Sequence, residues 1–305
     1  MAKVWAIVDT YNVTTYDTNT ISVILPDQQR LTLRIDESIP IQNDKIYQFD
    51  IEPIVFKERD QHLVHHHLDV DDPSLDVQTR YKAYGLFYKT SPVDCESMIH
   101  KIESAIDAIK NPAIKQITQT LYNAHKSDFY LYPAATKFHH AYIGGIAHHT
   151  TTMLALMDGF LNVYTYLNKD LLSAGIILHD LFKIEELSNP FAPEYTKEGK
   201  LIGHITMGAQ AIRDTAIQLN LYESEARLLL EHMVLSHHYY GNFGSPKKPN
   251  IPEALALHYI DNIDSKFAVL GETLETTEPG QFTAGIPILE RERYYRSITA
   301  NIPKK

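Results

Sequence analysis

Short stretches in which apolar and polar residues alternate characterise residues 1–90. They cover residues 3–8, 21–25, 31–35 and 46–51, and turn-forming residues separate them. Half-buried β-strands have this period of two, and several short strands joined by turns are typical of a small barrel. We therefore predict an N-terminal β-barrel, with an OB-like fold as the nearest type.

From residue 91 onward the apolar positions recur with the period of an α-helix. The first predicted helix covers residues 99–109 and ends before Asn111-Pro112, while the acidic stretch 69–76 marks a linker or domain edge. Residues 196–200 predict a tight turn, as in a hairpin. Further helices are predicted at residues 114–122, 143–160, 171–187, 203–219, 223–236 and 253–269.

These patterns predict an α+β multidomain protein. A small OB-like β-barrel occupies residues 1–90, and an all-α helical bundle occupies residues 91–305. A chain of 305 residues is long enough to bury one core in each domain.

Composition narrows the class of protein. The only cysteine, Cys95, excludes an internal disulfide, and neither a signal peptide nor a membrane-spanning run is evident. We therefore expect a cytoplasmic protein without a membrane partner. A net charge of −10 argues against a broad electrostatic grip on nucleic acid, although a local basic channel is compatible with it.

The most informative residues are His179 and Asp180, which follow the apolar stretch 171–178. A carboxylate buried beside an imidazole is costly unless something compensates its charge, and a divalent metal is the usual compensation. Within one helix the two side chains would point about 100° apart, so that an ion fits between them. Lys183 would lie on the same side, where its ammonium group suits a phosphate oxygen. A hydrogen-bonded structural pair is the alternative interpretation of His179 and Asp180.

The remainder of the chain offers more candidate metal ligands. Imidazole and carboxylate donors together favour manganese, iron, cobalt, nickel or zinc over magnesium and calcium, and the absence of thiolates argues against a structural zinc site. By contrast, His62 and residues 65–67 are interpreted as a solvated strand end. The additional candidate ligands are His149, His204, His237, His238 and Asp261.

The order of these residues resembles the HD phosphohydrolase superfamily, whose fold is a helical bundle. Their surroundings are similar to the YhaM-type 3′–5′ exoribonucleases, which join an N-terminal OB-fold to an HD domain. Two positions depart from that pattern: His148 stands where glutamate is common, and Phe182 where glycine is usual. The matching motifs are residues 138–145 before His149, 201–205 around His204, 232–238 ending in His237-His238, and 258–266 around Asp261.

The resemblance implies a metal-dependent enzyme that releases nucleoside 5′-monophosphates from the 3′ end of single-stranded RNA, with single-stranded DNA as a further substrate. It implies one or two divalent ions, with Mn²⁺ favoured and Fe, Co, Ni, Zn or Mg left open. Asp180 and Lys183 would be catalytic, and His140 and Lys183 would contact substrate. Asp180 would bridge two metal sites, one made by His149, His179 and Asp261 and the other by His204, His237 and His238. The RNA strand would be guided to the site by the barrel and by five lysines, Lys101, Lys110, Lys115, Lys126 and Lys137. An oligomer is compatible with the sequence.

Two alternative functions stay open at the level of sequence. One is an HD-domain hydrolase of nucleotides or cyclic dinucleotides, although residues 239–246 lack the Gly-Tyr-Pro loop of the cyclic-di-GMP type. The other is a non-catalytic, nucleic-acid-binding regulatory module. The complete set of candidate ligands argues against a decayed site.

Overall fold

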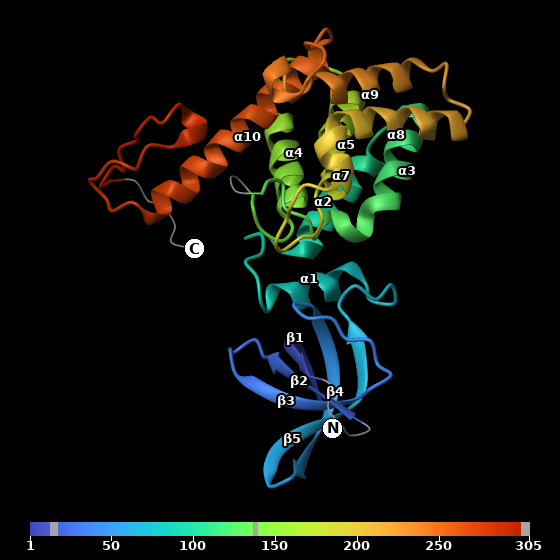
Figure 1. The fold of residues 1–305 in the computed structure, drawn as a ribbon. Helices are drawn as coiled ribbons and strands as arrows, with labels where there is room; N and C mark the ends of the chain where they lie inside the picture. The colour runs from blue at the N-terminus through green and yellow to red at the C-terminus, as the bar shows by residue number, and fades with distance from the viewer. Residues whose placement is uncertain (13–17, 137–139, 300–305) are drawn as a thin grey trace. The chain divides into compact units, whose positions relative to one another are not determined.

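The computed structural model describes residues 1–12, 18–136 and 140–299, and its ribbon is drawn in Figure 1. The chain divides into two compact units, Met1–Lys89 and Thr90–Lys305. In the described ranges, no helix has both the length and the apolar character needed to cross a membrane.

Five strands form the closed barrel of the first unit, in the order β1-β2-β3-β5-β4. All neighbours are antiparallel except β3 and β5, which pair in parallel at Leu33 and His62. Apolar side chains from alternating positions fill the interior, among them Val8, Ile21 and Phe49, which are fully buried. The predicted barrel is therefore confirmed. Its strands are β1 (Ala2–Asn12), β2 (Thr18–Ile24), β3 (Arg30–Asp36), β4 (Ile46–Phe56) and β5 (Arg59–Asp69).

Two elements of the first unit lie outside the predicted ranges, although His62 and residues 65–67 are interpreted from the sequence as a strand end. β5 carries polar residues and histidines over most of its length, but its backbone pairs with nearly the whole of β4. Helix α1 (Val77–Gly85) follows the acidic stretch, and Asp76 caps it by accepting a hydrogen bond from the backbone N–H of Thr79.

The second unit is a bundle of helices around α5, as Figure 1 shows. α5 contacts α2, α3, α4, α9 and α10, so it is buried on all sides, and residues 171–178 are all buried. This environment explains the uninterrupted apolar stretch before His179. The long helices are α2 (Cys95–Asp107), α3 (Pro112–Phe129), α4 (Gly145–Val163), α5 (Lys169–Leu178), α8 (His204–Gln218), α9 (Glu225–Ser236) and α10 (Pro252–Thr276).

Gly175 shows how tightly α5 is packed. A Cβ atom built at this position would lie 2.2 Å from the Cε of Met233 in α9. Only a residue without a side chain therefore allows α5 and α9 to approach each other this closely.

Two predictions for the bundle were wrong. The helix predicted at 171–187 is broken into α5 and the short α6 (Lys183–Glu186). The break follows His179, whose ring donates a hydrogen bond to the carbonyl of Ile176 and so competes with the helical backbone bond. The turn predicted at 196–200 is instead the short helix α7 (Lys197–Leu201), capped by the Thr196 hydroxyl. The short 3₁₀-helices are η1 (Gly241–Phe243) and η2 (Pro287–Leu289).

Candidate metal centre

Two helices of the bundle end at a histidine of the predicted ligand set. His179 is the C-cap of α5, and His237 is the C-cap of α9. In each ring Nδ1–H donates to a carbonyl three residues earlier, that of Ile176 at 2.8 Å and that of Val234 at 2.7 Å. A neutral imidazole with a protonated Nδ1 keeps its lone pair on Nε2, so both rings present Nε2 as a ligand atom.

Carboxylates orient two further histidines. In α4, the Nδ1 of His149 lies 2.6 Å from the Oδ2 of Asp264. At the start of α8, the Nδ1 of His204 lies 3.0 Å from the Oε2 of Glu186, whose Oε1 also accepts from the His204 backbone N–H at 3.2 Å. Metal-binding histidines in proteins usually make such a second bond through the ring nitrogen that does not bind the metal.

The Asp180 carboxylate lies between these four rings. Its Oδ1 is 3.4 Å from the Nε2 of His204 and 3.9 Å from the Nε2 of His237. Its Oδ2 is 3.4 Å from the Nε2 of His179 and 3.9 Å from the Nε2 of His149. Each oxygen of one carboxylate therefore faces a different pair of imidazoles.

The candidate ligands form two groups around Asp180. In each group one ligand atom from every residue lies within 4.8 Å of the others. The first group is His149, His179 and Asp261, with the Nε2 of His149 at 3.3 Å from the Oδ1 of Asp261. The second group is His204, His237 and His238. The structure thus brings together all seven residues that the sequence analysis proposed as ligands, in the same two groups.

Buried polar atoms in this cluster fit a divalent cation. The Nε2 atoms of His179, His204 and His237 and the Oδ1 of Asp180 are buried and have no hydrogen-bond partner within residues 1–12, 18–136 and 140–299. Leaving such atoms without a partner is costly in a protein interior. A cation bound by these lone pairs would remove that cost, and imidazole with carboxylate is a donor set that catalytic metal sites use.

The electrostatics of the cluster also suit a cation. Burial raises the pKa of Asp180, but neighbouring groups, above all the charge of Lys183, outweigh it and hold this pKa well below the usual value. Burial opposes a charge on His149 as well, yet Asp261 and Asp264 raise its pKa to about 10. His237 has its pKa lowered well below the usual value by burial and by His238. The ring of His237 is therefore neutral, which is the form that binds metals, and a metal at His149 would displace a proton.

Lys183 and His140, the predicted substrate contacts, bond to different carboxylates, Asp180 and Asp264. The Nζ of Lys183 is 2.7 Å from the Oδ2 of Asp180. His140 is buried, with its Nε2 at 2.8 Å from Asp264 and its Nδ1 at 2.7 Å from the hydroxyl of Tyr142. That hydroxyl also lies 2.6 Å from the Nδ1 of His148. His140 therefore supports the carboxylate that orients His149, while its contact with substrate stays a prediction.

Sequence reasoning missed two residues that hold the site in place, Asp264 and Glu186. Asp264 follows Asp261 by three residues on α10 and therefore lies on the same face of the helix. That spacing was a usable signal. Glu186 offered no such signal in the sequence, because its position depends on the break between α5 and α6.

Two residues mark departures from the family pattern. His148 joins the hydrogen-bond network of His140, and the ring of Phe182 packs edge-on against that of His125, with centroids 4.9 Å apart.

Several predicted residues lie away from this cluster. The histidines of β5 belong to none of the groups that could hold a metal among the described residues. Of the lysines proposed to guide the strand, Lys115 pairs with Asp107 and Lys126 with Glu103. Lys137 lies outside the described residues.

Comparisons with known proteins agree with this geometry. Residues 146–266, which include all seven candidate ligands, match the HD domain family. The chain is 45% identical over 216 residues to the 3′–5′ exoribonuclease YhaM of Geobacillus sp. (strain WCH70). The match covers 71% of this chain and 66%, just under two thirds, of that protein. No solved structure gives a significant match.

Proposed function

Since this chain contains an HD domain and is related to a YhaM exoribonuclease over 71% of its length, we propose that it is a metal-dependent 3′–5′ exoribonuclease. The observation that carries the proposal is the position of Asp180 between two groups of ligand atoms. A site with this arrangement suits two ions held by one shared carboxylate. RNA as the substrate rests on the relative, whose name states that activity.

In the proposed site, His149, His179 and Asp261 would hold one divalent ion, His204, His237 and His238 would hold the other, and Asp180 would serve both. Mn²⁺ is favoured, because imidazole nitrogens suit it better than they suit magnesium or calcium. Bound metal supplies Lewis acidity that activates water and polarises a phosphate.

The residues of the chain would supply orientation and charge. Asp264 and Glu186 fix the ring planes of His149 and His204, and the carbonyls of Ile176 and Val234 fix those of His179 and His237. Lys183 is charged, because Asp180 raises its pKa against the effect of burial. Its ammonium group would face the phosphoryl oxygens as negative charge develops on them.

The overall reaction is hydrolysis of the 3′-terminal phosphodiester. Water adds to phosphorus, the bond to the 3′-oxygen of the preceding nucleotide breaks, and that oxygen takes up a proton. The products are a nucleoside 5′-monophosphate and a strand shortened by one nucleotide.

We assign the chemistry to the helical domain of residues 91–305, because every candidate ligand lies there. The barrel of residues 1–90 would guide the RNA strand and contribute no metal ligand.

A direct test incubates the purified chain with Mn²⁺ or Mg²⁺ and with 5′-labelled RNA, DNA and mononucleotides in parallel. Stepwise shortening of the 5′-labelled RNA supports the proposal, and the variant Asp180→Asn serves as the inactive control. Internal cuts that appear first would indicate an endonuclease instead. Hydrolysis of mononucleotides at a comparable rate would indicate a hydrolase of small nucleotides.

A further inference from the structure

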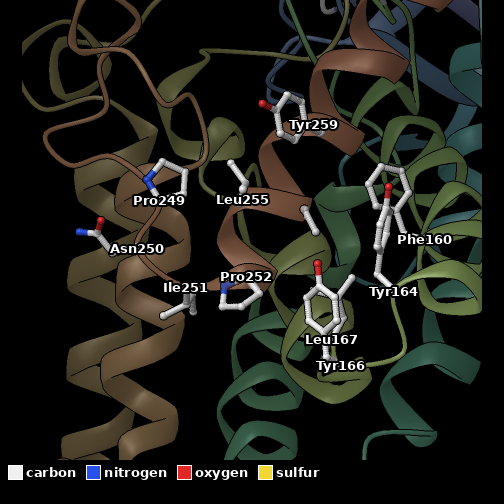
Figure 2. A pocket seen from close by; sticks show the side chains of 11 residues that line it. Phe160, Tyr164, Tyr166, Leu167, Pro249, Asn250, Ile251, Pro252, Leu255 and Tyr259 are labelled. Atoms are coloured by element: carbon white, nitrogen blue, oxygen red, sulfur yellow. The ribbon is translucent and has the colours of Figure 1, made fainter.

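A groove with a volume of about 560 Å³ lies in the helical domain and contains none of the candidate metal ligands. The end of α4 and the turn that follows it form one wall, and residues 249–252 and the start of α10 form the other (Figure 2). Its size is within the range of pockets that bind small organic groups.

Four of the eleven residues that line this groove are aromatic. Phe160, Tyr164 and Tyr166 lie on the α4 side, and Tyr259 lies on α10 (Figure 2). Three of these rings are unusually accessible, since Tyr164, Tyr166 and Tyr259 are 46%, 72% and 52% exposed. Neighbouring rings are spaced with centroids 6.0 Å apart for Phe160 and Tyr164 and 6.2 Å apart for Tyr164 and Tyr166. Exposed aromatic faces in a concave site suit a flat aromatic ligand.

A row of rings links the groove to the metal centre. Tyr239 follows the ligand pair His237-His238, and its ring lies 5.2 Å from that of His258. The ring of His258 lies 5.3 Å from that of Tyr259, and its Nδ1–H donates to the carbonyl of His237 at 2.8 Å. Tyr259 and the ligand Asp261 are two residues apart, so they face opposite sides of α10. The row therefore passes around α10 from the metal centre to the groove.

Three exposed lysines adjoin the lining residues in sequence. Lys247 and Lys248 precede Pro249, and Lys169 follows Leu167 by two residues. The ammonium group of Lys248 lies 5.3 Å from the centroid of the Tyr239 ring, within the row of rings. A cation therefore lies on the row of rings between the groove and the metal centre.

We propose that this groove binds nucleobases of the RNA strand that lie upstream of the cleaved phosphodiester. Aromatic stacking with cations along the backbone is how proteins hold single strands without reading their sequence, because every base has a π-face. An enzyme that removes nucleotides of any type from one end needs this kind of contact. The inference rests on the proposed exoribonuclease function and adds a second binding site to it.

The test compares Tyr166→Ala and Tyr259→Ala, singly and together, in the full-length chain. Phe267→Ala is the matched control, because Phe267 is an exposed ring on the same helix outside the groove. Tyr166→Phe and Tyr259→Phe keep the aromatic faces and should behave as the parent protein. Steady-state kinetics are measured on a series of 5′-labelled oligoadenylates from a dinucleotide upward.

Stacking of one base corresponds to a change of about tenfold in affinity. Each alanine variant should therefore raise KM about tenfold for long oligomers, with kcat nearly unchanged. The dinucleotide should be unaffected, since the groove residue Tyr259 and the candidate ligand Asp261 face opposite sides of α10. The effect should appear above a threshold length, and the phenylalanine variants and Phe267→Ala should show none.

One result would overturn the inference while leaving the proposed function intact: an unchanged KM for long RNA in the double alanine variant. If the sedimentation coefficient of that variant also changes, the groove is instead a contact between copies of the chain. Failure of the parent protein to cleave RNA would instead refute the proposed function. The groove would then be tested separately, by comparing the RNA affinity of Asp180→Asn with and without the alanine substitutions at Tyr166 and Tyr259.

Discussion

Asp264 gives the sharpest test of how the metal centre is built. Its Oδ2 lies 2.6 Å from the Nδ1 of His149 and 2.8 Å from the Nε2 of His140, so a single oxygen orients two rings. In Asp264→Asn the side chain keeps its size but loses its charge, and its NH₂ group cannot accept a bond. The ring of His149 would then lose either its charged partner or its orientation.

The expected magnitude follows from this contact. Replacing an outer partner of a metal-binding histidine weakens metal affinity by about 10- to 100-fold, which corresponds to about 1.4–2.8 kcal/mol. Titration calorimetry of the chelator-treated protein with Mn²⁺ measures this directly. It reads binding whether or not the variant is active. At a fixed metal concentration well above the Kd of both proteins, the stabilisation that the metal adds to the free energy of unfolding should fall by about the same amount.

Asp158→Asn is the matched control, because Asp158 is an exposed aspartate on the same helix as His149. It should bind Mn²⁺ as the parent protein does. An Asp264→Asn variant that binds Mn²⁺ with an affinity within twofold of the parent would refute the orienting role that we assign to Asp264.

Three further predictions follow from the fold and the site. Asp180→Asn should abolish cleavage of RNA, and after chelation Mn²⁺ should restore parent activity better than Ca²⁺; retained turnover at matched metal loading would remove Asp180 from the mechanism. Gly175→Ala should lower the free energy of unfolding in urea by about 1–3 kcal/mol through the clash with Met233, whereas Gly159→Ala, where nothing lies within 4 Å, should raise it by up to about 1 kcal/mol. Deletion of residues 1–89, after circular dichroism shows a folded product, should raise KM for long RNA but not for a dinucleotide; an equal loss of kcat on the dinucleotide would show that the barrel completes the active site.

Regular patterns made much of the fold predictable. The alternating strands of the barrel and the apolar faces of the long helices of the bundle are local signals, and each appears in the structure near its predicted range. The full length of β5, of which only a strand end was expected, and the whole of α1 escaped prediction for a physical reason. β5 is held by backbone pairing with β4 rather than by its own apolar residues, and α1 has little apolar asymmetry of its own.

The candidate metal site was also predictable only in part. The candidate ligands were recognisable as histidine and aspartate in or beside apolar helices, where burying them is costly unless a metal or another partner compensates. The end of α5 at His179 could not be seen, because the continued apolar pattern through Leu181 and Ile184 also suits a longer helix. The position of Glu186 depends on that break, so its hydrogen bond with His204 could not be predicted from the sequence either.

Because His179 and His237 close α5 and α9, the lengths of these helices determine where two candidate ligand atoms lie. Each ring is anchored to the last turn of its own helix, so the direction of its ligand atom depends on the residue at which the helix stops. Inserting or deleting one residue within α5 would turn His179 by about 100° and shift it by about 1.5 Å along the axis. Both changes would move its Nε2 away from Asp180. Homologous proteins can therefore vary the composition of these helices more freely than their length, and loops elsewhere should absorb most of the insertions that arise in evolution.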